Sequence, residues 1–372
     1  MRRLFVTLAI TLAAARASAQ TGYERFSLDT TASIDFFHGI SPAPLFDASD
    51  NVSHQPQIIV DITGTARIGK GWQAFFRPWF RLPRPASATG DTPDWDVQIY
   101  QASLRYEHAG EVSTRVDLGY MPSPVGLGIF DVNPRQNPTI AGHAGYFTPL
   151  LPFDTGSARP SVIASTYPLA GVFTVSASHW DARAAVTNSA PVRISIAGVT
   201  TNPKATPVFE AGAGVTPIIG LRLGASFAHG AYLKASEFVP ALAQVDRTLT
   251  LAGFEGEYAV RYTKISGEVI HDTFTTATND VGATEWFIQA TQTITPRWAI
   301  AGRHEGTSAP AVGLGIAPFG AQPRLLANEL TAVFRVNRDI MLKGGYYARQ
   351  SYGRLDWDQQ AAFQAVFQHR WW

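Results

Sequence analysis

The chain of 372 residues is long enough for one large domain or two ordinary ones, and its 30 basic and 29 acidic side chains are nearly balanced. That balance gives no reason to expect nucleic acid as a partner, and the absence of cysteine excludes disulfide bonds and thiolate chemistry. Hydrophobic residues make up 45% of the chain and charged residues only 16%, below the usual quarter, so the fold must accommodate a large apolar surface.

The first residues have the order of a secretory signal peptide. Two arginines give a basic start, residues 4–14 form a short apolar run, and residues 17–19 read Ala-Ser-Ala, a small-residue cleavage site. The apolar run is too short to span a membrane as a helix. We therefore expect residues 1–19 to be cleaved before Gln20. Cleavage removes three arginines and leaves 27 basic against 29 acidic side chains.

Beyond this segment no apolar run of about 18 residues exists, and apolar residues instead alternate with polar ones. In residues 57–69, "QIIVDITGTARIG", one face reads Ile, Val, Ile, Gly, Ala, Ile and the other reads Ile, Asp, Thr, Thr, Arg. Period two over such a length predicts a long strand with two different faces. About ten residues is the length that a tilted strand needs to cross a bilayer.

The same alternation recurs along the whole chain. The segments 160–168 and 247–258 fit it with either face outward. With these included, we predict strands at 25–37, 56–69, 72–81, 96–107, 111–120, 160–168, 171–181, 207–216, 220–230, 247–258, 261–271, 284–294, 298–305, 325–336, 340–350 and 359–371.

The links between these segments alternate between short and long. Short turns such as Lys70-Gly71 and 295–297 follow every second strand, and the intervening links are long and rich in Gly, Pro, Ser and Asp. This alternation is typical of an outer-membrane barrel with short periplasmic turns and long extracellular loops. We therefore predict an all-β fold, an antiparallel transmembrane β-barrel of about 16 strands with a water-filled interior. A soluble periplasmic propeller or double sandwich is the alternative.

The longest link, residues 121–159, is the third long loop and carries apolar side chains that a solvated loop would not need. We expect it to fold inside the barrel wall and to constrict the pore. The apolar residues are Leu127, Ile129, Phe130, Tyr146, Phe147, Leu150, Leu151 and Phe153.

Three short motifs around this loop resemble a known family. They are "GYMPSPVG", with Gly119, Tyr120, Pro124 and Gly126; "PFDTGSAR", with Pro152, Phe153, Thr155, Gly156 and Arg159; and "WD", Trp180 and Asp181, at the end of a predicted strand. In this order they resemble the β-barrel porins of Gram-negative outer membranes, of the phosphate-selective type. The resemblance implies an outer-membrane location and a homotrimer.

Charged residues on the polar faces and in the long loop are the candidates for a pore constriction, where width and charge discriminate between solutes. On the polar faces these are Arg67, Arg77, Arg81, Arg105, Arg115 and Arg335, and in the loop Asp131, Arg135, His143, Asp154 and Arg159. Acidic loop groups opposite basic wall groups would create a transverse field. Alternatively, these charges only solvate the interior and pair the loop with the wall.

The arginine excess favours a passive diffusion porin for small polar solutes with a preference for anions. The sequence contains no Gly-x-Ser-x-Gly motif and no histidine spacing for a metal, so we expect no enzyme, cofactor or metal. The alternatives are a selective barrel for more apolar molecules, a barrel enzyme such as a lipase, and a structural barrel or adhesin.

The chain ends "AFQAVFQHRWW", a final strand with Phe363, Phe367 and Trp371 on one face and glutamines on the other. Trp372 falls one residue out of this pattern. The apolar face is expected to meet outer-membrane lipid, with the tryptophans at the interface. The aromatic ending resembles the C-terminal signal that the barrel-assembly machinery recognises.

Overall fold

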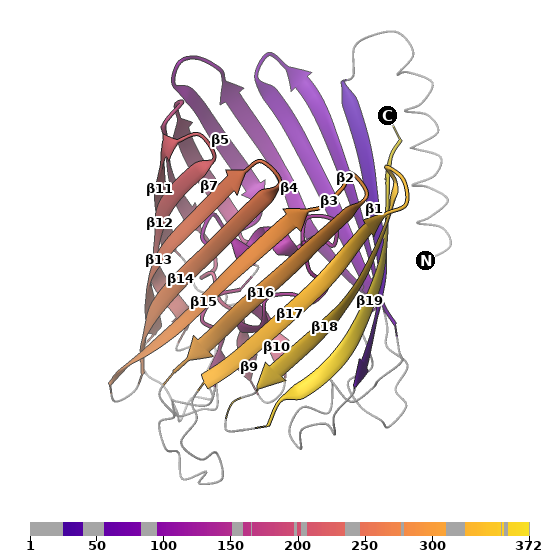
Figure 1. Ribbon diagram of the computed structural model, residues 1–372. Coiled ribbons are helices and arrows are strands. Elements are labelled where there is room, and N and C mark those ends of the chain that lie inside the picture. Colours follow the sequence, from indigo (N-terminus) through magenta and orange to yellow (C-terminus); the bar gives the residue numbers. More distant parts are fainter. Residues whose placement is uncertain are drawn as a thin grey trace.

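The chain forms a closed barrel in the computed structural model, which describes residues 25–39, 56–82, 95–150, 159–164, 166–196, 199–201, 207–234, 246–276, 279–309, 324–350, 352 and 356–371. Figure 1 shows the tilted strands of the wall and, at its upper end, short turns that join neighbouring strands. Within the described ranges, no helix is both long enough and apolar enough to cross a membrane. The expected signal peptide and Trp372 lie outside the described residues.

Sixteen strands make up the wall, and each is antiparallel to its neighbours. They are β1 (Phe26–Gly39), β2 (Gln57–Gly69), β3 (Trp72–Leu82), β4 (Asp96–His108), β5 (Ser113–Tyr120), β7 (Leu169–Ser176), β8 (Trp180–Thr187), β11 (Val208–Ile218), β12 (Leu221–Leu233), β13 (Arg247–Val260), β14 (Thr263–Thr275), β15 (Asp280–Thr293), β16 (Trp298–Ser308), β17 (Arg324–Arg335), β18 (Ile340–Gln350) and β19 (Asp358–Arg370). The barrel closes because β1 pairs with β19 from Asp29–Arg370 to Gly39–Gln360.

The two faces of the wall differ as the alternation predicts. The outer face exposes large apolar side chains all round, among them Phe76, Leu104, Phe254 and Leu330. The inner face of the same strands carries charged and polar groups such as Glu329. An apolar outer wall with closed edges is the form that a strand protein needs in lipid, where every backbone N–H must find an internal partner.

Two of the predicted strands are wrong. Residues 160–168 are not in the wall: β6 (Arg159–Pro160) pairs with β9 (Ile194–Ile196), which pairs with β10 (Val199–Thr201), in a separate small sheet. Val162, Ile163 and Ala164 are fully buried, so this irregular segment is apolar because protein covers it on all sides.

The predicted strand 171–181 covers β7, a short turn and the start of β8. Trp180 and Asp181 therefore begin a strand and do not end one, and the short turn lies at 177–179 and not at Leu169-Ala170. The number of wall strands is still 16, because one predicted strand was false and another was merged with its neighbour.

Two glycines of the family motif, Gly119 and Gly126, lie where the chain leaves β5. Both have positive φ, 131° and 92°. A Cβ on Gly119 would meet the backbone of Ala102 and Ser103, and one on Gly126 would meet the Tyr146 hydroxyl. Only glycine combines these backbone angles with such close neighbours. The chain can therefore turn away from the wall after β5.

We expect Gly119→Ala to lower the free energy of unfolding of the detergent-solubilised barrel by about 1–3 kcal/mol, and with it the melting temperature. The reason is that the alanine Cβ would meet backbone atoms at a positive φ. Heat-dependent mobility on unboiled gels and circular dichroism melts measure this. Gly344→Ala is the matched control, since no atom lies within 4 Å of a Cβ there. Equal melting temperatures for the two variants would contradict the expectation.

Candidate functional site

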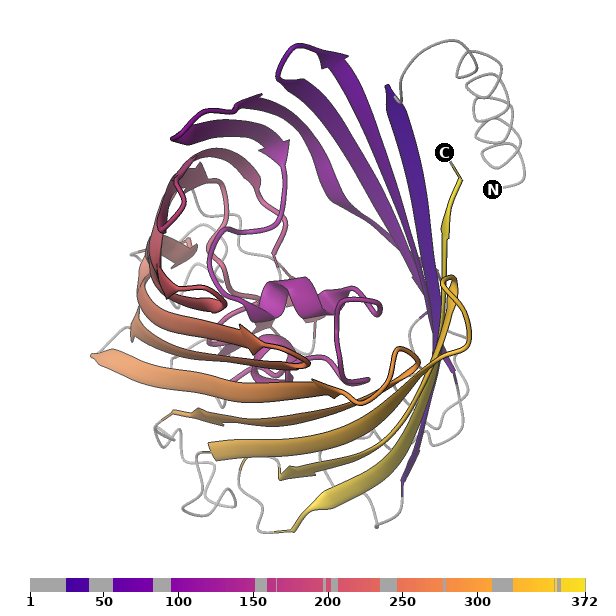
Figure 2. The ribbon, with the colours of Figure 1, turned by 45° about the horizontal axis from the view of Figure 1, so that its top comes forward.

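The segment Met121–Leu150 after β5 lies inside the ring of strands (Figure 2). It contains a 3-10 turn, Gly128–Val132, and the short helix α2, Ala144–Phe147. Its buried side chains form one apolar cluster with the inner wall of β11–β15. The segment contributes Val125, Ile129, Tyr146 and Leu150, and the wall contributes Val208, Ala228, Tyr232, Leu233, Leu249, Leu251, Ile270, Phe274, Val281 and Ala283.

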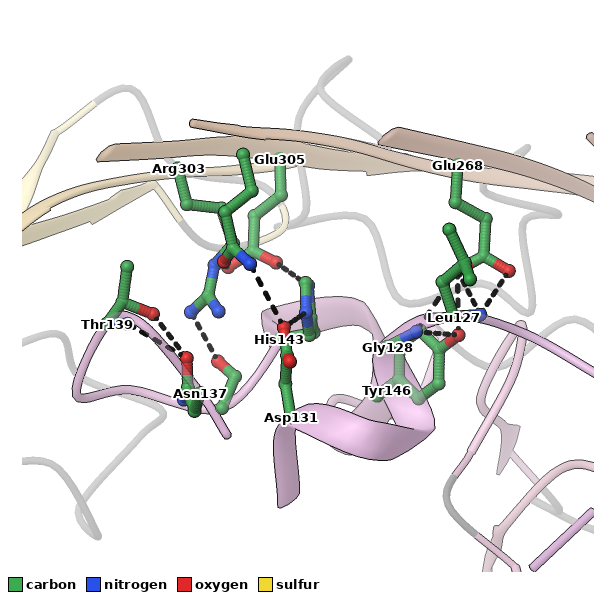
Figure 3. A network of polar contacts seen from close by, with 12 residues as sticks. Leu127, Gly128, Asp131, Asn137, Thr139, His143, Tyr146, Glu268, Arg303 and Glu305 are labelled. Carbon is green, nitrogen blue, oxygen red and sulfur yellow. Dashed lines mark hydrogen bonds and ion pairs between the residues drawn. The ribbon is translucent and has the colours of Figure 1, made fainter. Parts of the chain in front are cut away.

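Two wall carboxylates hold the irregular backbone of this segment. Glu268 of β14 accepts hydrogen bonds from the backbone N–H of Leu127 at 3.0 Å and of Gly128 at 3.3 Å, and from the Tyr146 hydroxyl at 2.9 Å (Figure 3). Glu329 of β17 accepts bonds from Ile140 and the following residue, at 2.6 and 3.2 Å. These N–H groups have no strand partner, so buried carboxylates satisfy them.

A second cluster centres on His143, whose side chain is only 1% exposed. Its Nε2 lies 2.9 Å from Asp131 of the same segment, and its Nδ1 lies 3.2 Å from Glu305 of β16 (Figure 3). Gln289 of β15 also donates to Asp131. Beside them, Arg303 donates to the backbone carbonyls of residues 141 and 142 at 2.8 and 3.0 Å.

The two carboxylates around His143 favour the protonated form of the imidazole. Burial and the charge of Arg303 lower its pKa, but the bonds to Asp131 and Glu305 outweigh them, and the pKa lies above the usual 6.5. Burial raises the pKa of Asp131, yet its bond from His143 leaves it below the ordinary value. The cluster therefore connects the inner segment to the wall through charged hydrogen bonds.

Lys343 of β18 also binds the inner segment to the wall. Its side chain is buried, and its Nζ donates to the carbonyl oxygens of Pro134, Asn137 and Thr139 at 2.7, 2.7 and 2.9 Å. Acidic wall groups thus bind the N–H groups of the segment, and basic wall groups bind its carbonyls.

The opposite wall, β2–β4, also contacts the segment. Asp61 of β2 accepts bonds from Arg77 Nε at 2.9 Å and from Asn133 Nδ2 at 3.0 Å. Next to this contact Tyr100 stacks on Tyr167, with ring centroids 3.9 Å apart. Trp79 stacks on the other face of Tyr100 at 4.7 Å.

Two cavities lie on either side of this contact. One, of about 350 Å³, opens toward the long connections and is lined by groups that include Trp79, Tyr100 and Val132. The other, of about 550 Å³, opens toward the short turns, and Val132, Arg77 and Tyr167 are among its lining residues. Val132 borders both cavities, so the free space approaches the segment from both ends of the barrel.

Arginines are prominent in the cavity at the short-turn end. Arg105 and Arg115 share one carboxylate, Asp117, at 2.6 and 2.8 Å, which leaves one positive charge in excess. On the facing wall Arg222 lies 2.8 Å from Asp181 and 2.6 Å from Glu255. Arg183 also lies 3.7 Å from Glu255, so this second cluster of two arginines and two carboxylates is neutral.

The structure brings the predicted residues together only in part. Asp131 and His143 bond to each other, and Arg81, which pairs with Asp96 at 3.2 Å, lines the same cavity as they do. Arg77, Arg105 and Arg115 line the cavity at the short-turn end together. Four other candidates lie apart from both groups: Arg67 and Arg335 are exposed near the short turns, Arg135 is exposed on the inner segment, and Arg159 is in β6.

Several predicted motif residues cannot be placed. Asp154, Pro152, Phe153, Thr155 and Gly156 lie outside the described residues. Of the others, Tyr120 is exposed on the outer face, and Pro124 borders the cavity at the short-turn end. Phe363 and Phe367 are exposed on the outer face of β19, as expected. Trp371, directly after β19, is also exposed, and its indole donates to Thr30 at 2.9 Å.

The sequence reasoning missed the wall groups that hold the inner segment: Glu268, Arg303, Glu305, Glu329 and Lys343. Each occupies a polar-face position in an alternating strand, and that pattern places it on the inner face. The pattern does not reveal that a loop far away in the sequence supplies its partners.

No protein-family model matches the chain, and no curated protein matches it. Solved structures do resemble it. OmpF of Salmonella typhi, in complex with daunomycin, gives a TM-score of 0.60 at 13% identity over 92% of this chain and 97% of that chain. An anion-selective porin from Comamonas acidovorans gives 0.57 at 11% identity, covering 93% and 98%. The outer membrane channel DcaP of Acinetobacter baumannii gives 0.55 at 9% identity, covering 92% and 96%.

This protein has the 16-stranded barrel fold of outer-membrane porins. Its apolar outer wall, its closed edges and this fold locate it in the outer membrane of a Gram-negative bacterium.

We expect the stability of the barrel to depend on pH through His143. Because its folded pKa is raised, the protonated imidazole stabilises the fold fully below about pH 6.5, and this contribution is lost as the pH rises through the folded pKa. The melting temperature of the wild type should therefore fall on the alkaline side more than that of His143→Gln. Thermal melts in detergent between pH 5 and pH 9 measure the difference. Parallel curves for the two proteins would contradict this role.

Proposed function

We propose that the protein is a passive diffusion channel for small polar solutes, with a preference for anions. The observation that carries this proposal is the pair of cavities that reach Val132 from the two ends of the barrel. A wall of this strand number leaves an aqueous interior, which the inner segment only partly fills. A diffusion channel needs a water-filled path through the barrel and no moving part.

The constriction of this channel is the narrow place between β2–β4 and the inner segment. The Arg77–Asp61–Asn133 contact and the Tyr100–Tyr167 stack lie there, between the two cavities. The firm attachment of the segment to β14–β18 supports this assignment, because a constriction selects by size only if its rim stays in place.

The charge of the lining supports anion preference. At the long-loop end Arg81, Arg193 and Arg349 line the cavity with only Asp35 and Asp131 as acids. At the short-turn end Arg77, Arg105, Arg115, Arg183 and Arg222 line the cavity with Asp117, Glu255 and Glu257. Asp61 and Asp181 pair with Arg77 and Arg222, so the positive excess lies at Arg105 and Arg115, which share one carboxylate. Fixed guanidinium groups favour carboxylates and phosphates. One of the similar structures is an anion-selective porin, and the sequence resemblance to phosphate-selective porins makes phosphate the first anion to test.

Three further parts of the proposal rest on the sequence: a signal peptide at residues 1–19, assembly into a homotrimer, and recognition of the C-terminal strand by the barrel-assembly machinery. The outward Phe363, Phe367 and Trp371 support the last of these. We propose no catalytic activity, and a lipase assay on the refolded protein tests that.

A selective channel for more apolar solutes is the second candidate. Phe37, Ile59 and Trp79 line the long-loop cavity beside its arginines, so a solute with an apolar body and an anionic group would fit it. Low ohmic conductance together with uptake of such solutes would favour this candidate over an open porin.

In planar bilayers under a salt gradient, we expect a reversal potential that shows anion preference. The double variant Arg105→Ala, Arg115→Ala should shift it toward cations, because Asp117 then loses both neutralising groups. Arg335→Ala, an exposed arginine on β17 near the short turns, is the control and should leave it unchanged. Cation preference of the wild type would overturn the proposed selectivity.

We expect Arg77→Ala to raise the single-channel conductance, because it removes a large side chain from the proposed constriction, where Arg77 and Asn133 both donate to Asp61. Arg67→Ala, near the short-turn end of β2, is the matched control. Wild-type conductance in Arg77→Ala, with an intact gel-mobility shift, would place the constriction elsewhere.

A further inference from the structure

A shallow groove of about 380 Å³ runs over the outer face of β15–β18. Its floor is low because Ala290 and Gly302, which are cross-strand partners, have little or no side chain. Ile288 and Leu330 rise on either side and are 53% and 60% exposed. The outer wall is therefore hollowed here, between protruding apolar side chains.

The groove has a polar end. His304 Nδ1 lies 2.7 Å from the side-chain oxygen of Asn328 on the next strand, and both residues line the groove. The indole of Trp286 packs edge-on against the His304 ring, with centroids 4.8 Å apart. Since β16 runs from its short turn at Trp298 to Ser308 at a long connection, this end points toward the long loops.

The same kind of pair recurs at a similar height on the outer wall. His229 of β12 lies 2.9 Å from Thr250, and His271 of β14 lies 2.8 Å from Thr284. These histidines are eight residues past the first residue of their strands, and His304 is six past that of β16. Hydrogen-bonding side chains and an indole on a lipid-facing wall belong at the boundary between headgroups and hydrocarbon.

We propose that this groove binds an acyl chain of an outer-leaflet glycolipid whose sugar headgroup hydrogen-bonds to His304. The long loops face outward in such barrels, so the polar end lies in the outer leaflet. Because Nδ1 faces Asn328, Nε2 is the ring nitrogen that can reach hydroxyl or amide donors of a headgroup.

The arrangement of polar and apolar residues along the groove favours a lipid over a second copy of the chain as the occupant. The polar groups lie together at the headgroup level and the floor below them is apolar, which matches one amphipathic molecule lying along the wall. A stable protein interface needs a broad complementary patch, whereas this hollow spans four strands and is bounded by protruding side chains. The proposal is independent of solute transport.

The test uses the purified full chain in detergent, titrated with lipid A, an acylated and phosphorylated disaccharide, and with phosphatidylethanolamine as the comparison lipid. We expect lipid A to raise the melting temperature of the wild type and phosphatidylethanolamine to raise it less. Gly302→Leu fills the groove and should weaken lipid A binding about tenfold or more. His304→Phe should abolish the difference between the two lipids.

Gly344→Leu is the matched control, because this glycine is also outward-facing with open space at its Cβ but does not line the groove. Wild-type lipid A affinity in Gly302→Leu would overturn the proposal. A second result would also overturn it: if Gly302→Leu keeps the lipid A affinity of the wild type but its mass by light scattering differs from that of the wild type, a second copy of the chain is the occupant. If Gly302→Leu does not fold, Ala290→Phe fills the same floor from β15.

Discussion

Closure of the wall through the pairing of β1 with β19 is the constraint on which the rest of this structure depends. In lipid no water can satisfy an open sheet edge, so the wall must return on itself. A barrel of 16 strands is too wide for its own side chains to fill, and the interior needs either water or further chain. The segment Met121–Leu150 fills part of it, and the two cavities remain.

The two parts of the inner wall that face this segment carry different kinds of side chain. Along β11–β18 the wall presents apolar side chains, carboxylates and Lys343, which satisfy an irregular backbone that has no strand partner. Along β2–β5 the wall presents arginines that pair with Asp61 or share Asp117 and face open space. The attachment of the segment and the proposed selectivity thus lie on opposite sides of one barrel, so a change on one side need not disturb the other.

The errors in the sequence interpretation have the same origin. Segment 247–258 fitted either orientation because Leu249 and Leu251 point inward and are apolar, which the covering segment requires. Residues 160–168 imitate a wall strand in sequence because buried apolar side chains recur in them, yet Ser161 and Ala164 bond to residues 193 and 191 and not to a wall strand. Alternation identifies a covered face, but it does not distinguish cover by lipid from cover by protein.

The sequence by itself determined the fold class and the outer face, because period-two alternation and link lengths are local properties, whereas the predicted number of strands is right only because two errors cancel. It also determined which charged residues face inward. Only the tertiary structure decided which of them meet: Glu268 with Gly128, His143 with Glu305, and Lys343 with Pro134, more than 100 residues away in the chain. Barrel closure and the inward turn at Gly119 bring these groups together, and no local pattern records distances across the interior.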